Sequence, residues 1–222
     1  TLKVYENIIG DTTTSLAVKK ARLIFTTRSH DQLVNNKYPR TLKLESRTLD
    51  YTNHSNVFSR EKLDIGTRFF LENLPKTEQA SVIIDLGCGN GLVGTCAAFD
   101  NPNSKFFFID ESYMAIESAK QNFQNTHPQM RFETIWANCL DGFEAEVDTV
   151  LCNPPFHQNN VIGDHIAWKM FTGSHRVLKK GGTLRVIGNR HLNYHIKLKK
   201  IFGNCKTVAT NKKFTILEVT KK

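Results

Sequence analysis

The chain has 222 residues, 40% of them hydrophobic, which is enough for one complete α/β domain with residues to spare. None of its apolar runs approaches the roughly 20 residues that a bilayer-spanning helix needs, and no secretion signal opens the chain, so we expect no membrane association. The formal net charge of +9 favours a polyanionic partner such as nucleic acid, although a solvated basic face would produce the same balance.

The cysteines are scattered along the chain and form no Cys-x-x-Cys pair. This pattern argues against a zinc site and against a disulfide framework, so we expect no bound metal. Unpaired cysteines are typical of a reducing compartment, and we therefore expect a cytoplasmic protein. The five cysteines are Cys88, Cys96, Cys139, Cys152 and Cys205.

The beginning of the chain resembles its end. Ile8–Thr14 matches Ile201–Thr207 after a gapless shift of 193 residues, and in both copies a pair of lysines and then an apolar pair follow in register. Because the second copy ends the chain, we expect the first to be the tail of a preceding, duplicated domain. We assign residues 1–28 to that tail, 29–52 to a linker or hairpin, and 53–222 to the main, catalytic domain.

Strands and helices alternate from about Tyr51 onward, which predicts an α/β fold with a doubly wound, mostly parallel sheet. Seven strands are expected, and the last two form an antiparallel hairpin around Asn211–Lys213. A basic turn and two glycines, Lys179–Gly182, are expected to end the longest helix. The expected strands are 81–85, 105–110, 132–136, 149–152, 183–188, 207–210 and 214–219, and the expected helices include 114–124, 164–178 and 194–202.

A glycine-rich loop follows the first strand of this domain and opens a helix. It contains Asp85, Gly87, Gly89 and Gly91, and glycines let a backbone turn sharply and approach a ligand without a side-chain clash. In a strand–turn–helix unit such a loop indicates a nucleotide-type cofactor, although a tight structural turn would need glycines as well. Asp85 would repel a pyrophosphate but could accept a hydrogen bond from the ammonium group of an amino-acid cofactor.

The next strand ends in Asp110, where a carboxylate can accept hydrogen bonds from both hydroxyls of a ribose. The alternative is that Asp110 caps the following helix, which Ser112 could do equally well. The loop and this acid resemble the first two motifs of the class I S-adenosylmethionine methyltransferases. That resemblance implies S-adenosylmethionine as the cofactor, with Asp110 at its ribose. Asn138 stands where that family usually has an acid that contacts the adenine amine.

The fourth strand ends in the most specific motif of the chain, Asn153-Pro154-Pro155-Phe156. An aromatic amine is a poor nucleophile because its lone pair is delocalised, and the Asn153 side-chain oxygen and the Pro154 carbonyl could hold its hydrogens and favour a tetrahedral nitrogen. Proline fixes φ and with it the direction of that carbonyl. Phe156 offers a ring on which a base can stack. The motif resembles that of methyltransferases acting on adenine, guanine or glutamine amines.

Several segments together resemble the ribosomal-RNA guanine-N(2)-methyltransferases of the RsmC/RlmG type. Members of that family have two tandem methyltransferase-like domains, the first degenerate and the second catalytic, which agrees with the repeat. Residues 191–214 are most similar to the members that act on the 23S RNA of the large subunit. The segments that carry the resemblance are Asn56–Ser59, Leu63–Gly66, Asn153–Gln158, Asn189–Tyr194 and Lys199–Gly203.

The resemblance also implies roles for individual residues. Phe58, Asp64 and Gly66 would surround the methionine end of the cofactor, although the same residues would suit a plain helix cap. Among the implied substrate contacts, His157 could instead cap the following segment and Arg190 could be solvated. The implied catalytic residues are Asn153, Pro154 and Phe156, and the implied substrate contacts are Pro155, His157 and Arg190.

We therefore expect methyl transfer to the exocyclic amine of a guanosine in ribosomal RNA, by a monomer. A paired base cannot reach a deep pocket, so the target must be unpaired or flipped. Two alternatives are a protein glutamine methyltransferase and an inactive RNA-binding module. The basic charge and Asn189–Tyr194 argue against the first, and the intact glycine loop and Asn153 motif argue against the second.

Overall fold

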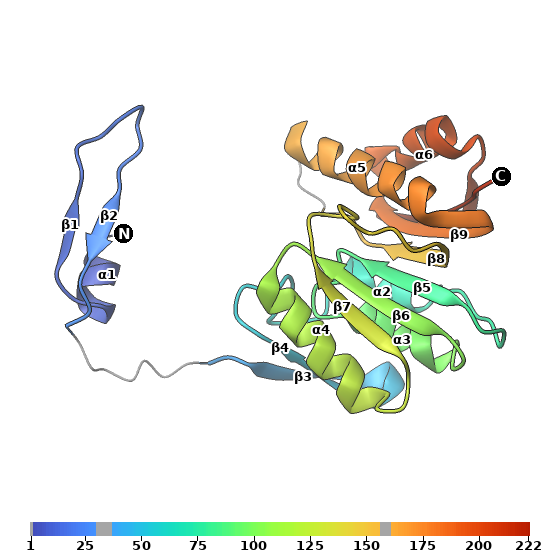
Figure 1. The fold of residues 1–222 in the computed structure, drawn as a ribbon, viewed down its shortest axis with the longest axis horizontal. Coiled ribbons are helices and arrows are strands. Elements are labelled where there is room, and N and C mark those ends of the chain that lie inside the picture. Colours follow the sequence, from blue (N-terminus) through green and yellow to red (C-terminus); the bar gives the residue numbers. More distant parts are fainter. Residues whose placement is uncertain (1, 30–36, 156–160) are drawn as a thin grey trace. The chain divides into compact units, whose positions relative to one another are not determined.

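The computed structural model describes residues 2–29, 37–155 and 161–222, and for residues 161–164 it describes the backbone alone. It divides into two compact units, Thr1–Lys37 and Tyr38–Lys222, which are described separately (Figure 1). None of the helices in these residues is both long enough and apolar enough to cross a membrane.

The first unit consists of helix α1 (Leu2–Ile8) and the antiparallel strands β1 (Thr12–Thr14) and β2 (Ile24–Thr26). The Thr12 hydroxyl donates to the Gly10 carbonyl at 2.9 Å and ties the start of β1 to the end of the helix. No hydrophobic side chain is buried among the described residues of this unit. Its exposed large apolar side chains are Leu2, Val4, Ile8, Leu16, Val18, Leu23, Ile24 and Phe25.

The second unit is built on a seven-stranded sheet, and five of its strands are parallel. Along the chain, the first three of these strands follow one another toward one edge of the sheet. The chain then returns and adds the other two on the opposite side of the first strand. In open α/β sheets ligands bind at such a switch point, beyond the carboxyl ends of the strands. The spatial order is β10 (Lys206–Thr210), β11 (Phe214–Thr220), β9 (Leu178–Asn189), β8 (Val147–Cys152), β5 (Val82–Leu86), β6 (Lys105–Asp110) and β7 (Phe132–Trp136).

Helices cover both faces of this sheet, as predicted for a doubly wound fold (Figure 1). Successive side chains of a strand point to opposite faces, so Phe106 and Phe108 of β6 join one hydrophobic core and Phe107 and Ile109 join the other. The unit therefore has three layers with a core on each side of the sheet. One face carries α2 (Ile65–Leu71), α3 (Leu92–Phe99) and α4 (Tyr113–Thr126), and the other carries α5 (Val161–Val177) and α6 (Tyr194–Phe202).

A separate antiparallel hairpin, β3 (Arg40–Leu44) and β4 (Leu49–Asn53), precedes the main sheet and packs against α4. The Asn122 side chain of α4 accepts from the Thr52 amide at 2.7 Å and donates to the Thr52 carbonyl at 2.8 Å. Because of this packing, the second unit begins at Tyr38 and includes residues that the sequence analysis assigned to the linker.

The observed sheet confirms the predicted seven strands and the closing antiparallel hairpin. The largest difference in an element boundary lies at β9, which begins at Leu178 although the sequence predicts a strand start at Thr183. The Gly181 amide donates to the Lys221 carbonyl at 2.8 Å, and the Lys221 amide donates to the Gly182 carbonyl at 2.9 Å. The glycines predicted to end a helix therefore extend a strand, because a distant segment provides their hydrogen-bond partners.

The last helix and hairpin of the second unit repeat the local structure of the first unit. After the shift of 193 residues, α1, β1 and β2 fall on α6, β10 and β11. The antiparallel pair Thr14↔Ile24 then corresponds to Thr207↔Leu217, so the strand register is the same in both copies. The sequence repeat is therefore also a repeat of secondary structure and pairing.

Candidate active site

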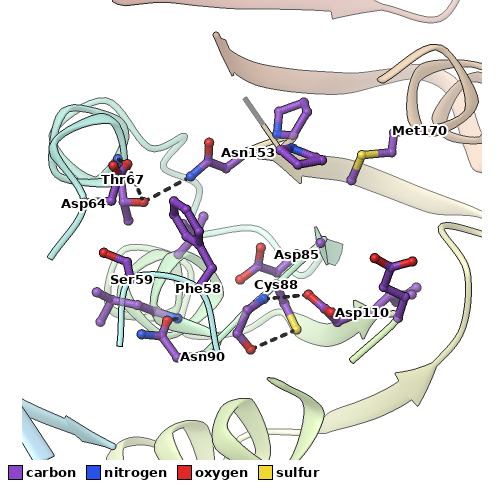
Figure 2. Close-up of a pocket in the computed structure, with 18 of the residues that line it drawn as sticks. Phe58, Ser59, Asp64, Thr67, Asp85, Cys88, Asn90, Asp110, Asn153 and Met170 are labelled. Carbon is purple, nitrogen blue, oxygen red and sulfur yellow. Dashed lines mark hydrogen bonds between the residues drawn. The ribbon is translucent and has the colours of Figure 1, made fainter. Parts of the chain in front are cut away.

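A cavity of about 740 Å³ lies at the carboxyl ends of β5, β6, β8 and β9, where the strand order switches (Figure 2). Most residues that the sequence analysis singled out line this cavity. Gly66, Gly91 and Arg190 do not line it, and Phe156 and His157 lie outside the described residues. The predicted residues that line it are Phe58, Asp64, Asp85, Gly87, Gly89, Asp110, Asn138, Asn153, Pro154 and Pro155.

The glycine loop after β5 forms the floor of one half of the cavity. Gly87 and Gly89 have φ angles of +68° and +54°, which glycine adopts without strain. The amides of Gly87 and Cys88 both donate to the Ile109 carbonyl, at 2.8 and 3.1 Å, so the loop is held against β6. A Cβ added at Gly89 would meet no atom within 4 Å, so the loop leaves open space there for a ligand.

Two of the predicted cofactor glycines have structural reasons to be glycine. A Cβ on Gly91 would lie 2.7 Å from the Ala119 Cβ, so this residue allows α3 to pack closely on α4. A Cβ on Gly66 would lie 2.9 Å from Asp64 Oδ2 and 3.1 Å from the Phe214 ring. Both glycines permit close approaches between neighbouring segments of the chain.

The carboxyl group of Asp85 lies in the wall of the cavity, and the residue is only 3% exposed. Its Oδ2 accepts a hydrogen bond from the Gly94 amide at 2.7 Å. Burial raises the pKa of the Asp85 carboxyl to about 8, and the negative charge of nearby Asp110 adds to that rise. A cation bound in the cavity would favour the ionised form and would therefore release a proton from Asp85 at neutral pH.

Asp110 holds the backbone around the cavity with both of its oxygens. Oδ2 accepts from the Gly89 amide at 2.9 Å, and Oδ1 accepts from the Ser112 amide at 2.8 Å. The helix cap of α4 is Ser112, whose hydroxyl accepts from the Ala115 amide at 3.4 Å, so the capping alternative for Asp110 is wrong. A carboxylate has about four acceptor positions, which leaves Asp110 able to accept from a ligand as well.

Asn138 lies beside Asp110 because of the way the chain leaves β7. The Ala137 amide donates to the Asp110 carbonyl at 3.0 Å, and this bond extends the pairing of β6 and β7 by one residue. Asn138 therefore lines the cavity next to the acid at the end of β6. Phe58, which is 66% exposed, lines the same cavity from the segment before α2.

Asn153 at the end of β8 is oriented by a chain of hydrogen bonds from α2 (Figure 2). Asp64 caps α2, and its Oδ2 accepts from the Thr67 amide at 2.8 Å and from the Thr67 hydroxyl at 3.3 Å. Because that hydroxyl gives its proton to Asp64, it accepts from Asn153 Nδ2, at 3.0 Å. The Asn153 amide can then have only one orientation, with Oδ1 directed away from Thr67.

The side-chain oxygen of Asn153, which does not bond to Thr67, is buried. Asn153 Oδ1 has no hydrogen-bond partner among the described residues. An unpaired buried carbonyl costs about 1–3 kcal/mol, so it marks a place where a bound group can supply an N–H. Asn153 is thus a pre-oriented acceptor in a cavity that is also lined by the glycine loop, Asp85 and Asp110.

The cavity is also lined by residues to which the sequence analysis gave no role in the site, among them Thr67, Asn189, Lys213 and Phe214. Thr67 stands three residues after the cap Asp64, a spacing that places its side chain on the same turn. Asn189 ends β9 as Asn153 follows β8, so their positions after neighbouring parallel strands could have identified Asn189. Arg190, the residue predicted from that segment, is exposed, and its amide donates to the Lys213 carbonyl at 3.0 Å.

Solved structures share this architecture. The chain superposes on the 16S rRNA N2 methyltransferase RsmC of T. thermophilus with a TM-score of 0.81 and 17% identity, over 99% of this chain and 60% of that one. It also superposes on a methyltransferase from Pyrococcus furiosus with a TM-score of 0.62 and 18% identity, over 78% of this chain and 89% of that one. The fold is therefore that of the class I methyltransferases, as predicted.

Sequence relatives agree with this fold. The chain is 52% identical to the ribosomal RNA large subunit methyltransferase G of Pseudoalteromonas translucida and 51% identical to that of Vibrio vulnificus, in each case over its whole length. It spans 58% and 60% of the lengths of those relatives. The sequence model of the protein family described as the methyltransferase small domain matches residues 48–218. By this match, the chain belongs to the methyltransferase small domain family.

Proposed function

We propose that this chain transfers a methyl group from S-adenosylmethionine to the exocyclic N2 amine of a guanosine in the ribosomal RNA of the large subunit. The observation that carries the proposal is the buried Oδ1 of Asn153, which is oriented through Thr67 and has no hydrogen-bond partner within residues 2–29, 37–155 and 161–222. The names of the relatives support ribosomal RNA as the substrate, and the RsmC structure contains both AdoMet and guanosine.

The cofactor half of the cavity fits S-adenosylmethionine, whose sulfonium carries an electrophilic methyl group. Asp110 has acceptor positions left for ribose hydroxyls, and the open space at Gly89 admits the body of the cofactor. Asp85 would hold the ammonium group, and Asn138, which lines the same cavity, would accept from the adenine amine. Phe58 would cover the methionine end. These residues bind and orient the cofactor.

The substrate half of the cavity fits an exocyclic amine. Asn153 Oδ1 would accept one hydrogen of the amine and the Pro154 carbonyl the other, which localises the lone pair on nitrogen. Because these acceptors are held by the backbone of β8 and by Thr67, they need no rearrangement during the reaction. Arg190 and the exposed lysines around β10 and α6 would contact phosphates. Phe156 and His157 remain candidates for the base pocket from the sequence alone.

The direct test is incubation of the protein with radiolabelled S-adenosylmethionine and, separately, with 23S RNA and with ribosomal proteins from a strain that lacks the gene. We expect label in the RNA, recovered after nuclease digestion as N2-methylguanosine. Label in a glutamine of a protein would instead support the glutamine methyltransferase, and cofactor binding without any transfer would support the inactive module.

The pH dependence of cofactor binding provides a test of Asp85. In the free protein its carboxyl is protonated below pH 8, and a bound ammonium group favours the ionised form. Affinity for S-adenosylhomocysteine should therefore rise with pH between 6 and 8, by at most about tenfold per unit, and level off above pH 8. Calorimetry in buffers with different ionisation enthalpies would count the released proton. Asp85→Asn should abolish the release, and an equal release from that variant would contradict the assignment.

We further propose that the first unit is the tail of a preceding, duplicated methyltransferase-like domain. Its helix and hairpin share the order and register of α6, β10 and β11, and its apolar side chains are exposed where the corresponding strand residues Ile216 and Leu217 are buried. The relatives are longer than this chain, which is consistent with such a domain. We also propose that the protein is a monomer that acts in the cytoplasm.

A duplicated domain would supply part of the RNA contact. The 222-residue chain should then bind S-adenosylhomocysteine as tightly as the longer protein but bind and methylate 23S RNA less well. Its remaining RNA affinity should fall steeply with salt, because phosphate contacts release counterions. Binding and methylation assays on both chains across a salt series would measure this. Equal RNA affinity and equal site selectivity would contradict the proposal.

A further inference from the structure

Two buried amide oxygens without partners line the cavity, and the proposed reaction uses only one of them. They are Asn153 Oδ1 and Asn189 Oδ1, and both belong to the small set of buried, unpaired polar atoms in the described part of the chain. β8 and β9 are hydrogen-bonded neighbours in which Cys152 pairs with Val186. Asn153 therefore follows β8 and Asn189 ends the adjacent parallel strand β9, at the same edge of the sheet.

Asn189 is held more rigidly than a loop residue. It is 6% exposed and is the last residue of β9, where it pairs with Phe214 of β11. The preceding Gly188 lies against the Tyr194 ring, so close that an added Cβ would be 2.6 Å from Tyr194 Cδ2. Backbone pairing on one side and this packing on the other fix the position from which the Asn189 side chain extends.

We propose that Asn189 Oδ1 accepts the N1–H of the target guanine while Asn153 Oδ1 accepts from its N2 amine. This inference rests on the proposed function and assigns the choice of base to Asn189. Guanine presents N1–H and the N2 amine as adjacent donors on one edge. Two acceptors on neighbouring strand ends match that pair of donors, and each buried oxygen then gains the partner that it lacks.

The same arrangement rejects other amines. Adenine has a lone pair at N1 in place of a hydrogen, so Asn189 Oδ1 would face an acceptor and remain unpaired. A glutamine side chain has an amide NH₂ but no second donor next to it. A site built to bind a donor discriminates against analogues that lack it, because its own buried group is left without a partner.

The test compares guanosine with 1-methylguanosine, which lacks the N1–H, in binding to the protein saturated with S-adenosylhomocysteine. We expect the wild-type protein to bind guanosine about 10- to 100-fold more tightly than 1-methylguanosine. In Asn189→Ala the affinity for guanosine should fall to that for 1-methylguanosine. Asn189→Asp, which keeps an acceptor, should retain the preference. The control is Asn103→Ala, which removes an exposed asparagine whose side chain donates to the Glu78 carbonyl at 2.8 Å.

Each outcome decides between the alternatives. If Asn189→Ala lowers both affinities by the same factor, or lowers neither, Asn189 does not contact N1–H and the inference is wrong. Unchanged affinity for S-adenosylhomocysteine and an unchanged melting temperature would show that the variant is folded. Inosine, which has the N1–H but no N2 amine, separates the two proposals. If Asn189 governs a preference for inosine over 1-methylinosine but no methyl reaches guanosine in RNA, the contact stands and the proposed reaction fails.

Discussion

Replacing Asn153 by alanine should lower kcat by about 100- to 1,000-fold and leave the affinity for S-adenosylhomocysteine within a few-fold of wild type. The lost oxygen orients the attacking amine and belongs to the substrate half of the cavity, and the loss of one pre-arranged hydrogen-bonding group typically costs this much in rate. Single-turnover methyl transfer at saturating cofactor, with calorimetry for cofactor binding, would measure both quantities.

Thr67→Val is the matched test of how Asn153 is oriented. It keeps the backbone amide that Asp64 caps but removes the hydroxyl that accepts from Asn153 Nδ2. The amide of Asn153 could then turn, so we expect a smaller loss of kcat than in Asn153→Ala and little change in cofactor affinity. If Asn153→Ala instead loses cofactor binding and keeps its rate at saturation, its role is misassigned.

Replacing Asp110 by alanine should weaken binding of S-adenosylhomocysteine by about 100-fold or more. Two hydrogen bonds from ribose hydroxyls to a charged acceptor would be lost, each contributing about 1.5–3 kcal/mol. The glycine loop would lose its support as well, because Asp110 holds the Gly89 amide. Titration calorimetry is the measurement, and Asp110→Asn, which keeps one acceptor oxygen, should show a smaller loss.

Asp110 also supports the backbone at the start of α4, so stability needs its own control. Ser112→Ala removes the cap of that helix and should cost about 1 kcal/mol of stability without a comparable loss of affinity. Melting temperatures of both variants would separate the two effects. An Asp110→Ala protein that binds S-adenosylhomocysteine as tightly as wild type would remove Asp110 from the cofactor site.

Local patterns in the sequence predicted much of this protein correctly. An apolar run of strand length located β6 at its observed bounds, because a buried parallel strand is apolar over nearly its whole length. The bounds of the edge strand β7, which is partly exposed, were also predicted correctly. The glycine loop was recognisable because positive φ angles at Gly87 and Gly89 require glycine. The candidate site was predicted at the ends of strands because Asp110 and Asn153 directly end or follow apolar runs in the sequence.

The sequence by itself thus determined the fold class, the seven strands with their closing antiparallel hairpin, and the residues of the glycine loop and the Asn153 motif. Only the tertiary structure decided which distant residues meet them. Thr67 contacts Asn153 across 86 residues of sequence, and Asn189 joins the same cavity through the pairing of β8 with β9. The close approaches at Gly66 and Gly91 likewise involve distant segments, since Phe214 of β11 lies against Gly66 and Ala119 of α4 against Gly91. Such contacts depend on how helices and strands pack together, and no local spacing in the chain encodes them.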